Sequence, residues 1–273
     1  MNRHRGFATE TAVDFARALS RALVAEHIAR QPGLLQSLDP RVRLVGLLSL
    51  VIVVTLSRKL MVIGLLFLLA VVLAVLSRVS IVALATRVWL IVLGFTGVIA
   101  LPALFLTPGD PAATLGTESL VITRQGIATA SLLVARVQTA VTFTTLLVLC
   151  TGWIHVLKAL RTFGLPPEVI LMLAMTHRYI YLLVEATGQM LESRLSRTVG
   201  VLQGRERRRM TTRTAGVVLS KSITLSNEVF LAMQSRGFRG DVQLLAEHRM
   251  GAWDYLGLLA FLGVGVLSVW AGR

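Results

Sequence analysis

Long apolar runs alternate with short charged turns along most of this chain of 273 residues. Five runs approach or exceed the roughly 17 residues that a helix needs to cross a bilayer. They cover residues 42–56, 60–76, 88–106, 126–151 and 253–270. The pattern therefore predicts an all-α integral membrane protein with about five transmembrane helices.

The segment between the fourth and fifth runs, residues 152–249, has a different pattern. A helix is predicted from Pro167 onward, but His177 and Arg178 stand in its middle, where a transmembrane helix is normally apolar. A second helix, at about 211–236, has apolar residues along one face and polar residues along another. The apolar residues are Leu219, Ile223, Phe230 and Met233, and the polar ones are Lys221, Thr224, Glu228 and Ser235. This periodicity predicts amphipathic helices that lie along or beneath the membrane.

The positions of the basic residues favour the same topology. Four crossings from a cytoplasmic N-terminus return the chain to the cytoplasmic side by Thr151. A fifth crossing at 167–190 would place a cluster of arginines outside, against the tendency of basic loops to stay in the cytoplasm. The cluster comprises Arg194, Arg197, Arg205, Arg207, Arg208, Arg209 and Arg213. We therefore expect a four-helix transmembrane region at 41–151, a cytoplasmic-side domain at 152–249 and a last transmembrane helix at 250–273.

Residues 1–40 are predicted to form a cytoplasmic amphipathic segment. Phe15, Leu19 and Leu23 recur at helical spacing, and the stretch lacks the continuous apolar core of a signal peptide. Pro32 and Gly33 are expected to end its helix.

The net positive charge does not alter the interpretation as a membrane protein. The chain carries 28 Lys and Arg against 14 Asp and Glu, which in a soluble protein would suggest nucleic-acid binding. Only 15% of the residues are charged, however, and basic loops held on the cytoplasmic side account for the excess. No nucleic acid is expected as a partner, because aromatic residues do not alternate with the basic ones. Salt-sensitive binding of DNA or RNA by residues 190–213 would contradict this.

Sequence motifs for covalent chemistry are missing. The Lys-Ser of "LSKS" at 219–222 lacks the glycines of a phosphate-binding loop, so the chain is not expected to hydrolyse ATP. No HExxH or CxxC motif occurs and the five histidines are scattered, so neither a metal site nor a catalytic residue is predicted. The single cysteine, Cys150, is predicted to be a small core residue. An intramembrane enzyme, the alternative class, would need polar clusters within the spans.

Arg136 is the charged residue that interrupts the fourth span. A charge at mid-depth costs about 2.5 kcal/mol or more, so its side chain is expected to avoid lipid. It either contacts a partner subunit or donates to backbone carbonyls within the bundle, and the sequence favours neither.

Four collinear strings resemble the transmembrane T component of energy-coupling factor transporters, and most closely its cobalt-transport CbiQ group. They run from about Leu38 to Gly240 and so cover most of the chain. The strings are "LDPRVRLVG", "LPALFLTPGDP", "LRTFGLPPEVILMLAMTHRYIYLLVEATGQMLESRLSRT" and "LSKSITLSNEVFLAMQSRGF".

The resemblance implies a non-enzymatic subunit of an ABC-type importer in the cytoplasmic membrane of a bacterium or archaeon. Its partners would be two cytoplasmic ABC ATPases, which bind the ATP and magnesium, and a CbiM-like membrane S component, which captures the substrate. Residues 152–249 would be the coupling helices that transmit motion between them. No cofactor is expected in this chain.

The resemblance also implies two arginine motifs at helix ends that dock on the ATPases. The second motif falls on Ser235, Arg236 and Gly237. The first falls on Ser193 and Arg194, with Arg197 and Thr198 just beyond. Serine stands at 193 and 235 where the family often has alanine, and Thr198 stands where glycine is frequent, which leaves open whether Arg194 or Arg197 makes the deeper contact.

Likeness to the metal-uptake group implies that the cargo is cobalt for cobalamin biosynthesis. Nickel, or a vitamin such as biotin, is the alternative. Specificity in such systems resides in the S component, so no metal ligand is required in this chain.

Overall fold

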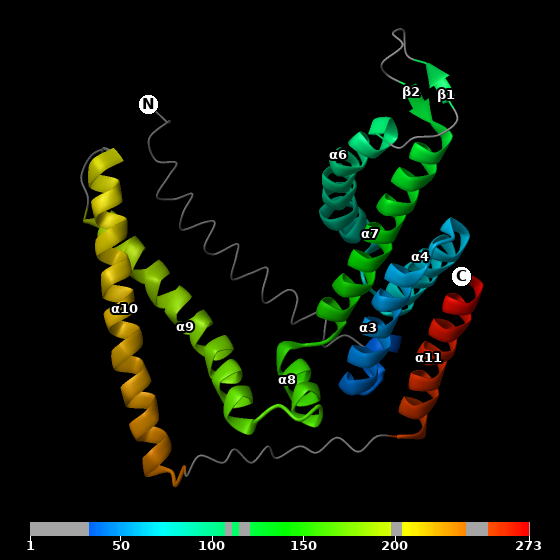
Figure 1. Cartoon of the computed structure of the whole chain (residues 1–273). Coiled ribbons are helices and arrows are strands. Elements are labelled where there is room, and N and C mark those ends of the chain that lie inside the picture. The colour runs from blue at the N-terminus through cyan, green and yellow to red at the C-terminus, as the bar shows by residue number, and fades with distance from the viewer. Residues whose placement is uncertain (1–32, 107–110, 115–120, 198–203, 239–250, 273) are drawn as a thin grey trace. The chain divides into compact units, whose positions relative to one another are not determined.

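The structure is a computed structural model that describes residues 33–106, 111–114, 121–197, 204–238 and 251–272. The predicted N-terminal amphipathic helix lies outside these residues. The described chain divides into two compact units, shown with their elements in Figure 1. We call residues 33–159 with 251–272 the bundle unit, and residues 160–238 the helix-pair unit. The prediction of an all-α membrane protein is confirmed.

The bundle unit contains the apolar helices. In chain order its elements are α2 (Leu34–Ser37), α3 (Pro40–Leu56), α4 (Leu60–Leu76), α5 (Ile81–Leu84), the π-helix η1 (Ala85–Trp89), α6 (Leu90–Leu106), β1 (Pro111–Thr114), β2 (Val121–Thr123), α7 (Arg124–Cys150) and α11 (Ala252–Gly272).

The first two spans form where their flanking residues predict. Asp39 caps the start of α3 with its side chain, and Pro40 follows at the first helical position, where its fixed φ suits a helix. Ser57, Arg58 and Lys59 separate α3 from α4. Charged and capping residues therefore define both ends of this hairpin.

The third helix begins earlier than the apolar run at 88–106 predicts. Helical structure starts at Ile81 and includes the π-helical turn at 85–89 before α6. Trp89, at the end of this turn, donates to the Thr142 hydroxyl over 3.1 Å and packs on Phe67, with ring centroids 5.2 Å apart. These contacts hold the turn against α7 and α4.

The predicted loop after the third span contains a short β-hairpin. β1 pairs antiparallel with β2, and Ala113 lies opposite Ile122. Thr123 then accepts a hydrogen bond from the Gly126 amide and so caps α7, which begins two residues before the predicted span.

The core of the bundle unit is shared by α3, α4, α7 and α11. Leu50, Leu66 and Phe143 are fully buried there, and so is Cys150, as its apolar context predicts. Gly46 lets α11 approach α3 closely, because a Cβ atom at that position would lie 2.5 Å from Cδ2 of Phe261. The small residue is thus a condition for this helix contact.

Helices α3 and α11 run parallel. Their first turns meet where Asp254 accepts from the Asp39 amide, and their last turns meet where Lys59 donates to the Ala271 carbonyl. The last residue of α7, Cys150, lies at the first turn of α3, because Arg43 donates to its carbonyl. The chain therefore leaves the bundle unit at the same end at which it returns to it.

The helix-pair unit follows α8 (Trp153–Thr162), which carries the chain out of the bundle unit. It consists of α9 (Pro167–Ser196) and α10 (Gly204–Ser235). The start of α9 and the end of α10 line one groove, so the two helices are antiparallel. They diverge from the connection between them (Figure 1).

Within the described residues, three helices are long and apolar enough to cross a membrane: 124–150, 167–194 and 252–272. The apolar helices α4 and α6 are shorter. The stretch 167–194 belongs to α9, which the charge pattern assigns to the cytoplasmic side. A crossing by α9 alone would bring the chain back to the wrong end of the bundle unit, and α10 is not apolar enough to reverse it. The placement of 152–249 on the cytoplasmic side stays a prediction.

Candidate functional site

The second predicted arginine motif lies at the C-terminal end of α10. Gly237 has a φ of +85°, in the left-handed region that favours glycine. Its amide donates to the Gln234 carbonyl over 2.9 Å, and the Phe238 amide donates to the Met233 carbonyl over 3.0 Å. This pair of bonds is a Schellman motif, which satisfies the last carbonyls of the helix with backbone donors alone.

Because the backbone closes the helix end, the side chains around it are available for other contacts. Arg236 and Ser235 are exposed, and Ser235 donates only to the Ala232 carbonyl one turn earlier. Phe238 and Met233 are half-buried and line the groove beside α9, so they fix the tip to the helix pair. The arrangement presents one guanidinium at a rigid helix end.

The first predicted motif lies at the C-terminal end of α9. Ser193 and Arg197 are exposed, and Arg197 is the first residue after the helix. Arg194 is half-buried. Thr198 lies outside the described residues. Arg197 is thus the more accessible of the two arginines, and which of them makes the deeper contact stays open.

The two motifs lie at opposite ends of the helix pair, because α9 and α10 are antiparallel and each motif follows a C-terminus. α10 has 32 residues, which corresponds to a length of roughly 48 Å at 1.5 Å per residue. Two separate partners, or two copies of one partner, could therefore contact the motifs without overlapping.

An apolar groove of about 480 Å³ lies between α9 and α10. The α9 side presents residues at helical spacing, among them Leu171, Met175, Tyr179 and Leu183. The α10 side presents Ser222, Leu225, Ser226, Val229, Phe230 and Met233, with Phe238 beyond the helix end. Methionine side chains of this kind adapt to the shape of an apolar partner, and aromatic side chains supply a large apolar contact area.

The face of α10 that contacts α9 shares only Phe230 and Met233 with the predicted stripe. Leu219 and Ile223 are 63% and 58% exposed, and Phe230 stands at the rim of the groove, 53% exposed. The residues that turn toward α9 are instead those near Ser222, Leu225 and Val229. Of the predicted stripe, Met233 lines the groove with Phe230 at its rim, whereas Leu219 and Ile223 remain uncovered within the described chain.

Arg136 donates from Nη2 to the Ser57 carbonyl over 2.8 Å. Ser57 is the C-cap of α3, so the guanidinium satisfies a helix end within the bundle unit. Of the two contacts that the sequence left open, the structure therefore shows the one with a backbone carbonyl within the bundle. A contact of Arg136 with another subunit stays a prediction.

Arg43 and Lys59 act on helix ends in the same way. Arg43 is 5% exposed and donates to the Cys150 carbonyl at the end of α7. Lys59 donates over 2.8 Å to the Ala271 carbonyl at the end of α11. Cations are favourable at helix C-termini, where unpaired carbonyls carry partial negative charge.

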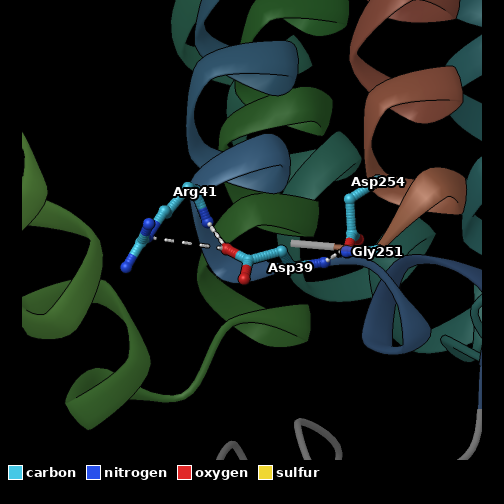
Figure 2. A network of polar contacts seen from close by, with 4 residues as sticks. All are labelled: Asp39, Arg41, Gly251 and Asp254. Atoms are coloured by element: carbon cyan, nitrogen blue, oxygen red, sulfur yellow. Dashed lines mark hydrogen bonds and ion pairs between the residues drawn. The ribbon is translucent and has the colours of Figure 1, made fainter. Parts of the chain in front are cut away.

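A second polar network ties the first turns of α3 and α11 (Figure 2). Asp254 accepts from the Asp39 amide over 2.7 Å and from the Gly251 amide over 2.9 Å, so one carboxylate serves two helix N-termini. Asp39 in turn accepts from the Arg41 amide over 2.8 Å, and its carboxylate lies 4.0 Å from Nε of Arg41. We did not anticipate this network, although Asp39 before Pro40 has the form of a helix start.

Metal ligands do not gather anywhere in the described parts of the chain, where no group of three His, Cys, Asp or Glu residues could hold an ion. The arrangement of this site is suited to protein contacts: two arginine-bearing helix ends, an apolar groove and an uncovered apolar stripe.

These features define a helical membrane protein with a helix-pair unit whose exposed arginines and apolar groove are suited to protein contacts. A family model described as cobalt transport protein, CbiQ, matches residues 33–245. The chain belongs to the CbiQ family of cobalt transport proteins.

Two curated relatives are consistent with this membership. The cobalt transport protein CbiQ of Rhodobacter capsulatus is 27% identical over 198 residues, which are 71% of this chain and 81% of that protein. The uncharacterized protein MJ1571 of Methanocaldococcus jannaschii is 29% identical over 254 residues, 92% of this chain and 87% of that protein.

Proposed function

We propose that this chain is the transmembrane coupling subunit of an energy-coupling factor importer. It transmits ATP-driven motion from two cytoplasmic ABC ATPases to a CbiM-like S component in the same membrane. The chain binds no nucleotide and catalyses no reaction; ATP and magnesium belong to the ATPases. The membrane is the cytoplasmic membrane, with the N-terminus of the chain on the cytoplasmic side.

The observation that carries the proposal is the pair of helix ends at opposite ends of the helix-pair unit. Arg236 and Arg197 are both exposed there, and the Schellman motif at Gly237 makes the end of α10 rigid. The guanidinium group is a planar fork of donors, suited to carboxylates or helix-end carbonyls on a partner. Two equivalent ATPases that change their separation during the ATP cycle would move these two ends relative to each other.

The apolar surfaces of the same unit support a membrane partner. The groove between α9 and α10 and the uncovered stripe of Leu219, Ile223 and Phe230 offer adjoining apolar areas. Contiguous exposed apolar surface of this kind marks interaction sites. We assign it to the S component, so that movement of the helix ends tilts the substrate-binding subunit.

The end-to-end arrangement of the bundle unit supports the cytoplasmic location of the helix pair. The chain leaves the bundle unit after Cys150 and returns to it at Gly251. Both points lie at the first turn of α3. A segment that begins and ends on one side of the membrane can reach two cytoplasmic ATPases without crossing.

Cobalt is the proposed cargo, for cobalamin biosynthesis. The support is membership of a cobalt transport family and the relative from Rhodobacter capsulatus. Nickel, or a vitamin such as biotin, is the alternative, and uptake assays with each cargo decide between them.

The test is co-purification of the ATPases with this chain and its S component after Arg236→Glu. Reversing the charge at a central docking arginine is expected to weaken assembly by roughly a hundredfold, a loss typical of interface hot spots. Arg197→Glu and Arg194→Glu are measured in parallel, and the larger loss identifies the deeper contact of the first motif.

The matched control is Arg213→Glu, which makes the same charge change at an exposed position of α10 away from its C-terminal end. It should assemble like the wild type. A fully assembled Arg236→Glu, Arg197→Glu complex with normal cobalt uptake would refute the docking role.

A further inference from the structure

From residue 33 onward the chain connects its two units twice, and both connections meet the bundle unit at one helix end. The outward passage follows Cys150, the last residue of α7, through α8. The return passage ends at Gly251, directly before α11. Arg43 of α3 holds the first of these points, and Asp39 of α3 is joined to the second through Asp254.

The contacts at the return passage are specific to a carboxylate. One oxygen of Asp254 accepts from Gly251, the N-cap residue of its own helix, and the other accepts from Asp39, the N-cap residue of α3. The bond to the Asp39 amide is partly buried, whereas the bond to the Gly251 amide is exposed. Figure 2 shows Asp39 and Asp254 at the starts of the two helices, with the Asp39 carboxylate turned toward Arg41. A displacement of Gly251 therefore acts on α3 as well as on α11.

The contact at the outward passage is buried and incompletely paired. Arg43 donates from Nη1 to the Cys150 carbonyl, while its Nε and the hydroxyl of the adjoining residue Thr151 are buried and have no hydrogen-bond partner among the described residues. A donor and an acceptor left unpaired at one junction mean that a rearranged junction could gain a bond.

We propose that Asp39, Arg43 and Asp254 form a clamp that holds both chain connections of the helix-pair unit on the first turn of α3. The inference rests on the proposed coupling function and adds the route by which motion enters the bundle. When the ATPases move the helix pair, the clamp passes that motion to α3, α7 and α11 together. These three are positioning residues, since they contact neither cargo nor nucleotide.

The route predicts a loss of coupling without a loss of assembly. The whole complex, reconstituted in proteoliposomes, is assayed for ATP hydrolysis and for cobalt uptake per ATP hydrolysed. Arg43→Met and Asp254→Ala should assemble and hydrolyse ATP like the wild type, while uptake per ATP falls about tenfold, as expected for loss of a hydrogen bond to a charged group. Arg43→Lys, which keeps a cationic donor, should restore a large part of the ratio.

The matched control is Lys59→Met. It removes a cation that also donates to a helix-end carbonyl, but at the opposite end of α3, away from both connections. Uptake per ATP should be unchanged. Wild-type coupling in both Arg43→Met and Asp254→Ala would overturn the clamp, and so would an equal fall in uptake and hydrolysis, which indicates only lost folded protein.

Hydrogen exchange on the chain alone separates this inference from the proposed function. The Asp39 and Gly251 amides should be protected in the wild type and exchange at least about tenfold faster in Asp254→Ala. Unprotected amides in the wild type would refute the clamp even if the ATPases bind. A wild-type chain that binds no ATPase would refute the proposed function and, with it, the transmission of motion. The Asp39 and Gly251 amides would still be protected in that case.

Discussion

Arginine side chains lie beside helix C-termini in both units of this chain, but with opposite results. In the bundle unit, Arg43 and Arg136 donate to the last carbonyls of α7 and α3, so the cation completes the fold. In the helix-pair unit, the end of α10 is completed by the amides of Gly237 and Phe238, and Arg236 remains exposed. An arginine side chain beside a helix C-terminus is structural where the backbone leaves carbonyls unpaired. It is suited to recognition where the amides of a glycine and the residue after it have already paired them.

The largest effect is expected in a test of whether α9 crosses the membrane, because a cysteine placed after it is labelled from outside the cell either fully or not at all. Cys150 is the single cysteine of the chain and is buried, so an introduced cysteine can be labelled selectively. Gly204→Cys, at the start of α10, should react with a membrane-impermeant maleimide only after the cells are permeabilised. Arg58→Cys lies between α3 and α4, at the end of the bundle unit opposite to both chain connections, and should react in intact cells. Labelling of Gly204→Cys from outside would contradict the cytoplasmic placement of residues 152–249.

The second test compares how tightly the helices pack in the two units. Gly46→Ala places a Cβ against the ring of Phe261 and should lower the free energy of unfolding by about 2 kcal/mol. Gly216→Ala, in α10, meets no atom within 4 Å and should raise the stability by up to about 1 kcal/mol, because alanine favours a helix. Thermal unfolding of both variants in detergent measures this, and equal destabilisation would show that both helices are tightly packed.

The helix stop at Gly237 should have a smaller effect. Gly237→Ala forces a side chain into the left-handed region and should cost about 1 kcal/mol, felt locally at the tip. Gly237→Asn should be tolerated better, since asparagine adopts this region more readily. Hydrogen exchange of the Phe238 amide reports the local loosening, and an unchanged exchange rate in the alanine variant would exclude the strain.

The smallest stability effect is expected for the arginines themselves. Arg136→Met removes the donor to Ser57 and also a buried Nε without a partner among the described residues, so the net cost should be about 1 kcal/mol or less. Arg236→Met should leave the melting temperature unchanged and weaken only partner binding. A lower melting temperature for Arg236→Met than for Arg136→Met would reverse the comparison.

The sequence predicts the spans of the bundle better than the contacts that organise it. α3 and α4 follow the apolar runs closely, because charged turns flank both of them. The third helix begins earlier, because Thr86 and Arg87 interrupt the apolar run without interrupting the helix. The bond from Asp39 to Asp254 joins residues 215 positions apart, and no local pattern reports such a pairing.

The docking residues illustrate the same limit. Gly237 after Arg236 predicts a helix stop, and the structure has one there, because a left-handed C-cap depends mainly on local sequence. The apolar stripe on α10 was predicted as a periodicity, yet periodicity does not say which face meets α9 and which stays uncovered. That choice depends on where the two helices cross.

The π-helical turn at Ala85–Trp89 also indicates how this helix evolved. A π-turn accommodates one residue more than an α-helical turn, so the helix from Ile81 to Leu106 corresponds to a regular helix that has gained a residue. Deleting one residue there should return it to α-helical geometry without shifting Leu90 onward. Homologous chains that differ by one residue in this stretch are then expected to keep the same packing against α7.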